Sequence, residues 1–167
     1  MKSDAASEAA PKDTVRVLGI AFAFFALAAF FTSLPLPALF YQAEPDAESP
    51  SRFPGFGLLL LGWIETLRLS TNGIAWLANP FFAFGILFLL VTRFGWALIL
   101  FLVSGAFATV SFGVESICID EAGNYAAVVG LGPGFWLWYY TILASCAVSF
   151  GFLFVRLSSR SSSASRT

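Results

Sequence analysis

The chain has 167 residues, of which 58% are hydrophobic, 17% are aromatic and only 11% are charged. A soluble domain averages about 45–50% apolar and about 25% charged residues, so this composition is typical of an integral membrane protein. The net charge of −1 gives no electrostatic reason to expect a nucleic-acid partner. Histidine is absent, which removes the commonest general base, metal ligand and proximal haem ligand, and no cofactor is expected.

Four long uncharged stretches predict four transmembrane helices, because a helix needs about 20 apolar residues to cross the hydrocarbon core of a bilayer. They cover 17–34, 73–91, 94–114 and 134–155. Four spans leave little chain for a separate soluble domain, so 17–155 is predicted to be one membrane domain. Residues 1–16 and the basic, Ser-rich segment 156–167 are predicted to be disordered tails.

The first apolar stretch has an alternative interpretation as a cleaved secretory signal peptide, because a basic region precedes it. Two features weigh against cleavage. The preceding tail also carries acidic residues, and Tyr41 stands where a cleavage site would need a small residue. We therefore expect an uncleaved span that ends at Pro35 and Pro37, since proline cannot continue a helix without losing a backbone hydrogen bond.

The segment 35–72 lies between the first two spans, on the side of the membrane opposite the termini. Its part 38–52 is predicted to be a solvated acidic loop. Residues 53–69 combine an uncharged half, too short to span, with Glu65 and Arg68, which lie three residues apart on one helix face. This stretch is interpreted as a helix in the membrane interface or dipping into it, and a fifth span is the less favoured alternative.

The segment 115–133 lies on the same side and predicts a β-hairpin. The apolar runs 116–120 and 125–129 flank a turn signal at Gly123-Asn124. An isolated two-stranded hairpin is marginally stable in water, so it is expected to pack on the other polar segment. The predicted fold class is therefore an all-α integral membrane protein of four transmembrane helices, with an outer interfacial helix and an outer β-hairpin.

The distribution of Lys and Arg predicts the orientation in the membrane. One side of the four-span scheme holds seven of them, Lys2, Lys12, Arg16, Arg93, Arg156, Arg160 and Arg166. The other side holds only Arg52 and Arg68. The positive-inside rule therefore places both termini in the cytoplasm and the two longer loops on the far side of the membrane.

The second span is interrupted by Asn79-Pro80. Pro80 has no N–H, so the carbonyl of Trp76 loses its helical partner and a kink is expected. In hydrocarbon that carbonyl and the Asn79 amide both need partners within the protein or in a water-filled cavity. The favoured interpretation is structural, with the Asn79 amide bonded to an adjacent helix or to the orphaned carbonyl. The alternative is a ligand or ion site at a broken helix, as in transporters.

Acidic residues gather on the predicted outer face. They are Glu44, Asp46, Glu48, Glu65, Glu115, Asp120 and Glu121. Oxygen-rich sites can bind Ca²⁺, but this spacing matches no cation-binding loop, so solvated surface is the favoured interpretation and no metal site is predicted. Glu65 is flanked by apolar residues and is the acid most suited to a further role. Cys118 and Cys146 are predicted at different depths, too far apart for a disulfide.

A series of short motifs runs through 53–155. They are Gly62-Trp63, Trp76-Leu77-Ala78-Asn79-Pro80, Gly123-Asn124-Tyr125, Gly130-Leu131-Gly132-Pro133-Gly134 and Leu137-Trp138. In this order they resemble small, uncharacterised bacterial four-span inner-membrane proteins labelled hypothetical. The resemblance implies a bacterial inner-membrane location and this topology, and it implies no function and no site residues.

The leading functional hypothesis is a non-enzymatic membrane protein that acts through protein contacts, as an accessory subunit, scaffold or assembly factor. Its partners would be the lipid bilayer and a membrane protein or further copies of itself. The second hypothesis is a small oligomeric channel or transporter with Asn79-Pro80 lining the path, although uncharged spans are unusual for ion coupling. An enzyme is third, because Glu65 or Asp120 would have to work without histidine.

Overall fold

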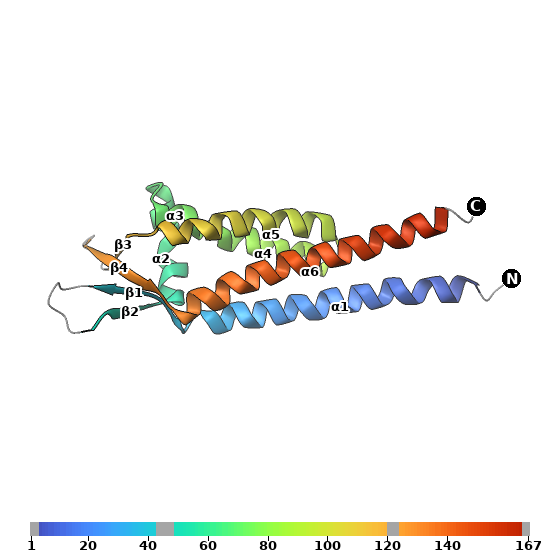
Figure 1. Ribbon diagram of the computed structural model, residues 1–167, viewed down its shortest axis with the longest axis horizontal. Coiled ribbons are helices and arrows are strands. Elements are labelled where there is room, and N and C mark those ends of the chain that lie inside the picture. The colour runs from blue at the N-terminus through green and yellow to red at the C-terminus, as the bar shows by residue number, and fades with distance from the viewer. Residues whose placement is uncertain (1–3, 43–48, 120–123, 165–167) are drawn as a thin grey trace.

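The computed structural model describes residues 4–42, 49–119 and 124–164. Its long helices lie side by side, and both chain ends lie at the same end of the molecule (Figure 1). Four helical segments are long and apolar enough to cross a membrane: Asp13–Ser33, Thr71–Leu90, Phe94–Gly113 and Pro133–Ser158. Each of the four predicted spans thus corresponds to a helix of sufficient length and apolar composition, which is the pattern of a multi-pass membrane protein.

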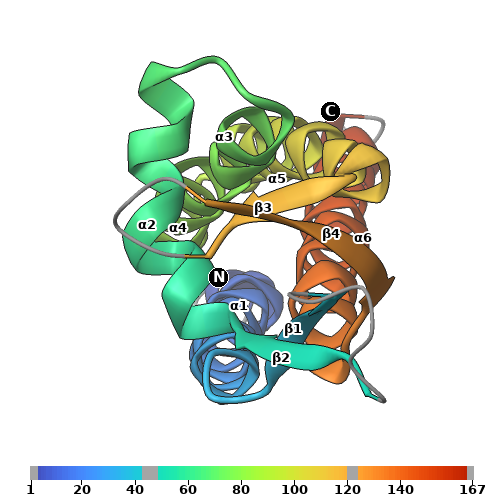
Figure 2. The ribbon, with the colours of Figure 1, turned by 90° about the vertical axis from the view of Figure 1, so that its left-hand side faces the viewer.

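The four spans form a closed ring of helices. Helix α1 (Asp4–Ser33) packs against α4 (Ala78–Leu90) and α6 (Pro133–Ala164), and α5 (Phe94–Thr109) packs against the same two helices. Seen along the bundle, α1 and α5 therefore lie on opposite sides of it (Figure 2). We call the end that carries the strands the sheet end, and the opposite end the terminus end.

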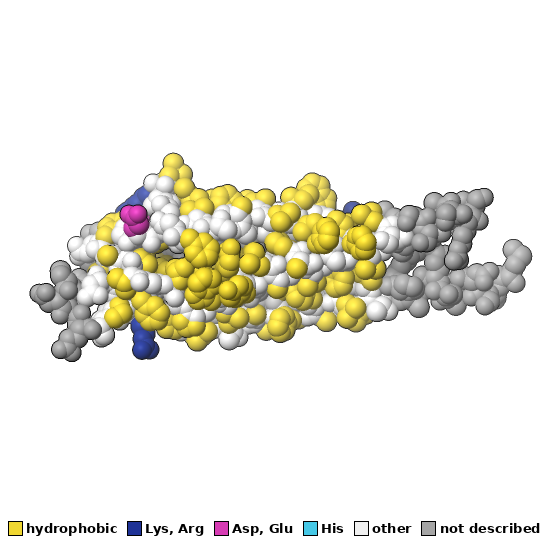
Figure 3. Space-filling view, in the orientation of Figure 1, with side chains coloured by type: hydrophobic (Ala, Val, Ile, Leu, Met, Phe, Trp, Pro, Cys, Tyr) yellow, Lys and Arg dark blue, Asp and Glu magenta, His cyan; other side chains and the backbone are white. Residues whose placement is uncertain are grey.

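Large apolar side chains fill the inside of the ring. Phe82, Leu89, Phe101 and Ile142 are each at most 2% exposed. The rings of Phe82 and Phe30 stack with their centroids 5.4 Å apart, which joins α4 to α1. Hydrophobic side chains are spread along the visible flank of the bundle, among other side chains and backbone (Figure 3).

Both terminal helices are longer than the sequence predicted. Helix α1 begins at Asp4, inside the predicted disordered tail 1–16, and α6 continues to Ala164, through most of the predicted tail 156–167. The physical reason is that a helix is costly to nucleate and cheap to extend, and each span supplies the nucleus. Residues 4–16 include Ala, Glu, Lys and Arg, which are good helix formers, although Pro11 is not. Residues 156–164 are rich in Ser, so that part of α6 depends more on extension from the span.

The two central spans are interrupted at the sheet end. The second span consists of α3 (Thr71–Trp76) and α4, which are separated at Leu77. The third span consists of α5 and the 3₁₀ helix η1 (Val110–Gly113). Between α4 and α5 the chain turns within three residues, with Thr92 in the left-handed region at φ 59°.

The sheet end contains four short antiparallel strands in the order β2-β1-β4-β3. They are β1 (Pro37–Gln42), β2 (Ser51–Pro54), β3 (Ser116–Cys118) and β4 (Tyr125–Leu131). The predicted hairpin is confirmed by the β3–β4 pairing, and it pairs with the other loop through β1 and β4.

The prediction that 38–52 is a solvated loop is wrong at both of its ends, because β1 and β2 pair there. The sequence Ala38-Leu-Phe-Tyr41 suits a strand, and β4 offers it an unpaired edge. The fold is therefore not all-α: a small sheet joins the two loops. The acidic residues Glu44, Asp46 and Glu48 and the turn residue Gly123 lie outside the described residues.

Helix α2 (Gly55–Leu67) crosses the bundle at the sheet end (Figures 1 and 2). Its first N–H groups are satisfied by the chain that leaves α1, since Gly55 and Phe56 donate to the carbonyls of Leu36 and Leu34 at 3.1 and 2.8 Å. A helix of 13 residues is about 20 Å long, too short for a fifth span. The separate helix predicted for 53–69 is confirmed.

Candidate functional site

The break between α3 and α4 is held together by the side chain of Asn79. Its Nδ2 donates to the carbonyl of Trp76 at 3.1 Å, the carbonyl that Pro80 leaves without a backbone donor. Its Oδ1 accepts the indole N–H of Trp138 on α6 at 3.0 Å. Two partners were predicted for the Asn79 amide, the orphaned carbonyl or an adjacent helix. Both are confirmed, because Nδ2 bonds the carbonyl of Trp76 and Oδ1 bonds Trp138 on α6.

A second bond supports the same break from α5. The hydroxyl of Ser104, which is fully buried, donates to the carbonyl of Ala78 at 2.8 Å. Leu77 therefore lies between two carbonyls that accept side-chain hydrogen bonds. The carbonyl of Trp76 accepts from Asn79, and the carbonyl of Ala78 accepts from Ser104. The discontinuity in the second span is a supported structural feature with its exposed backbone groups satisfied.

Trp76 connects the broken span to α2. Its indole N–H donates to the carbonyl of Leu59 at 2.8 Å, and its ring lies directly against Gly62. A side chain at position 62 would collide with this ring, so the glycine is what lets α2 and α3 approach. The predicted site residues Asn79, Pro80 and Trp76 are thus adjacent in space as well as in sequence.

The turn from α2 into α3 is equally tight. The N-cap hydroxyl of Ser70 accepts from the N–H of Gly73 at 3.1 Å, and the Thr66 hydroxyl donates to the Gly73 carbonyl at 2.9 Å. Leu69 adopts the left-handed conformation at φ 53° to close the turn. Gly73 lies against the backbone of Glu65 and Thr66, where no side chain would fit.

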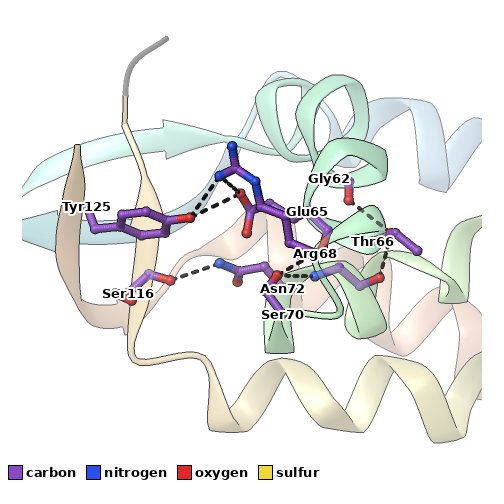
Figure 4. A network of polar contacts seen from close by, with 9 residues as sticks. Gly62, Glu65, Thr66, Arg68, Ser70, Asn72, Ser116 and Tyr125 are labelled. Atoms are coloured by element: carbon purple, nitrogen blue, oxygen red, sulfur yellow. Dashed lines mark hydrogen bonds and ion pairs between the residues drawn. The ribbon is translucent and has the colours of Figure 1, made fainter. Parts of the chain in front are cut away.

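Glu65 lies on the side of α2 that faces the sheet, and only 8% of it is exposed. Its Oε1 accepts from Nη1 of Arg68 and from the hydroxyl of Tyr125 on β4, both at 3.4 Å, and Arg68 also donates to that hydroxyl at 3.2 Å (Figure 4). These bonds raise the pKa of the Arg68 guanidinium above its ordinary value, chiefly through Tyr125 and then through Glu65. Arg68 therefore carries its charge at physiological pH.

The other carboxylate oxygen of Glu65 differs from the first. Oε2 is buried and has no hydrogen-bond partner among the described residues. A buried carboxylate oxygen without a donor is unfavourable, so it calls for a physical explanation.

Asn72 makes the second direct link between the helices and the sheet. Its Nδ2 donates to the carbonyl of Ser116 on β3 at 2.8 Å, beside the contacts of Arg68 (Figure 4). Together with Tyr125, this bond attaches the β3–β4 hairpin to α2 and α3. Neither the Arg68–Tyr125 contact nor the Asn72–Ser116 contact was predicted from the sequence. Arg68 and Tyr125, for example, are 57 residues apart, and no local signal pairs them.

A cavity of about 490 Å³ lies among these elements. Its walls come from the end of α1 and the chain after it, from α2 and α3, from the starts of α4 and α6, from η1, and from strands β1, β2 and β3. The polar or aromatic side chains in its lining include Glu65, Arg68, Asn72, Trp76, Asn79, Phe135 and Trp138. Most of the remaining lining is apolar, which is typical of small-molecule sites of about 300–1,000 Å³.

The other candidate residues lie apart from this cluster or outside the described chain. Glu115 is exposed, as predicted for a solvated acid, and Asp120 and Glu121 lie outside the described residues. Cys118 lies in β3 at the sheet end and Cys146 lies within α6, so the two cysteines occupy different parts of the molecule, as predicted.

Within the part of the chain that the structure describes, no three His, Cys, Asp or Glu side chains gather as a metal site would require. At the sheet end, Glu65 has one carboxylate oxygen that is bonded and one that has no partner among the described residues, and the residue lines a largely apolar cavity. Comparison of the sequence with protein-family models matches no family, and comparison with curated proteins finds no match either.

Proposed function

We propose that this protein is a non-enzymatic membrane protein that acts by binding at its sheet end, as an accessory subunit, scaffold or assembly factor for another membrane protein. The observation that carries the proposal is the side-chain attachment of the sheet to the helices. Arg68, Asn72 and Tyr125 hold the β3–β4 hairpin against α2 and α3. A surface fixed before binding loses less conformational entropy when a partner docks.

The attached sheet also presents groups that a partner can use. Tyr125 and Val129 on β4 are 51% and 55% exposed. The outermost strands, β2 and β3, have edges on which an extended segment of another protein could pair. Helix α2 adds exposed apolar side chains beside them, among them Phe56, Leu60 and Trp63.

The alternative is an oligomeric channel or transporter with Asn79-Pro80 lining the path. Asn79 does line the cavity, which favours some contact with a ligand. Below it, however, Phe82, Phe101 and Leu89 fill the ring of helices. A path across the membrane would therefore have to run between copies of the chain.

The orientation and the membrane are part of the proposal. The termini lie together at one end of the bundle, and the excess of Lys and Arg in the terminal and 92–93 segments supports a cytoplasmic position for that end. The resemblance of the sequence motifs supports a bacterial inner membrane.

Site-specific photo-crosslinking in cells tests the proposed role. A crosslinking residue replaces Val129 at the sheet end, and the matched control replaces Leu157 near the terminus end, which is 54% exposed. We expect a stoichiometric adduct with one other membrane protein from position 129 only. Equal adducts from both positions, or none from position 129, would contradict the proposal, and adducts between copies of this chain would favour the channel.

A further inference from the structure

The partnerless oxygen of Glu65 and the cavity occur at the same place. Glu65 lines the cavity, it is more than nine-tenths buried, and its Oε2 has no hydrogen-bond donor among the described residues. Oε1, in contrast, is bonded by Arg68 and Tyr125. The buried carboxylate is therefore half satisfied from the protein, and its residue lies in the wall of a space large enough for a ligand.

The chemistry of the carboxylate selects the head of that ligand. An ionised carboxylate only accepts hydrogen bonds, so the complementary group must be a donor such as a hydroxyl or an ammonium. An anionic head would add a second negative charge beside a carboxylate whose ion-pair partner, Arg68, already bonds its other oxygen. A head group without a donor would leave Oε2 without a hydrogen-bond partner.

The rest of the lining selects the body of the ligand. Leu58, Leu59 and Phe135 are among the apolar side chains of the cavity wall, and the rings of Trp76 and Trp138 add broad flat surfaces. Burial of an apolar chain against such a wall is favourable in proportion to the area removed from water.

The cavity is also reachable from the flank of the bundle. Leu61 and Ile64 line it, yet they remain 50% and 38% exposed, and Arg68 is exposed at the same edge. The cavity wall on α2 therefore includes side chains that also reach the surface, beside the exposed apolar face of this helix. An apolar face of this kind beside the cavity suits a molecule that is dissolved in the bilayer.

We propose that this cavity binds a membrane-soluble amphiphile whose apolar body fills the cavity and whose head donates a hydrogen bond to Oε2 of Glu65. The donor is a hydroxyl, as in a lipid alcohol, or an ammonium, as in a lipid amine. This site goes beyond the proposed function and does not depend on whether a protein partner docks on the sheet.

Three probes that differ only in the head group test the proposal. They are dodecanol, dodecylamine and dodecyl methyl ether, each brominated at the end of the chain so that it quenches nearby tryptophan. The full chain is reconstituted in lipid nanodiscs, and saturable quenching of its tryptophan fluorescence is measured. We expect saturable quenching by the alcohol, the amine or both, and only non-saturable quenching by the ether, which has no donor.

Variants of Glu65 distinguish the two donors. Glu65→Leu should weaken binding of either probe about tenfold or more, the equivalent of one hydrogen bond to a charged group. Glu65→Gln keeps an acceptor and removes the charge, so it should retain the alcohol and lose the amine.

A matched pair on α2 keeps the test informative if Glu65 variants fold poorly. Leu58→Phe adds volume inside the cavity and should weaken binding, whereas Leu60→Phe, at a 52% exposed position on the same helix, should not. Saturable binding of the ether as tight as that of the alcohol and the amine would overturn the proposal. So would the absence of saturable binding by all three probes, or unchanged binding in both Glu65→Leu and Leu58→Phe.

Discussion

The indole N–H of Trp138 on α6 donates to the side-chain oxygen of Asn79 on α4 across 3.0 Å. Because the same amide also donates to the carbonyl of Trp76, one side chain closes the break in the second span and fastens it to the last span. The arrangement explains how a proline is accommodated where lipid offers no hydrogen bonds.

Asn79→Leu is expected to lower the free energy of unfolding by about 1–3 kcal/mol, because two polar contacts are lost and each contributes about 0.6–1.7 kcal/mol in a membrane. Trp138→Phe removes only one of them and should cost less. Unfolding of the single and double variants in detergent gives the coupling between the two residues. Additive effects would show that the Asn79–Trp138 bond contributes nothing. An Asn79→Leu protein that is as stable as the natural chain but no longer supports its function in cells would instead favour a ligand role for Asn79.

Pro80→Ala is expected to have opposite consequences in two backgrounds. In the natural sequence the Trp76 carbonyl is already bonded by Asn79, so the new N–H at position 80 should change stability little. In the Asn79→Leu background the same N–H can take over the orphaned carbonyl and should recover about 0.5–1.5 kcal/mol. Equal effects of Pro80→Ala in both backgrounds, measured by the same unfolding assay, would argue against this account of the carbonyl.

Gly73→Ala is expected to be strongly destabilising, by about 1–3 kcal/mol or more, because the added methyl group meets the backbone of Glu65 and Thr66, which cannot rotate away. Gly151→Ala is the matched control. It lies on α6 with nothing within 4 Å of the added atom, so it should raise stability by about 0.5–1 kcal/mol. Melting temperatures of the two purified variants check the contrast. Similar melting temperatures would refute the close approach of α2 and α3.

Reporter fusions test the orientation. Fusions after Ser49 and after Asn124 should be active only with an enzyme that reports the outside of the cell, and a fusion at Thr167 only with one that reports the cytoplasm. This result follows from four spans and the bias of Lys and Arg toward the termini. An outside signal at Thr167 would require a fifth span or, if the signals at Ser49 and Asn124 are reversed as well, the opposite orientation.

Much of the helical part of this protein is determined by the sequence. An uncharged stretch of about 20 residues must become a helix in lipid, so composition alone located the four spans and the helix of 53–69. Pro35 and Pro37 marked the end of α1, and Pro80 marked the break, because proline acts on its own backbone. The extent of α1 and α6 was missed, since helix extension depends on an existing nucleus more than on local polarity.

The sheet end was decided only by the tertiary structure. Strand β1 forms because β4 lies beside it, and the bonds from Arg68 to Tyr125 and from Asn72 to Ser116 join residues far apart in the chain. The choice of Trp138 as the partner of Asn79 is equally nonlocal. The cavity exists because α2, two loops and the starts of helices meet around it, and one oxygen of Glu65 has no hydrogen-bond partner among the described residues. Periodicity and local propensity report a residue's sequence neighbours, whereas these features depend on which distant groups the packed chain brings within hydrogen-bond distance.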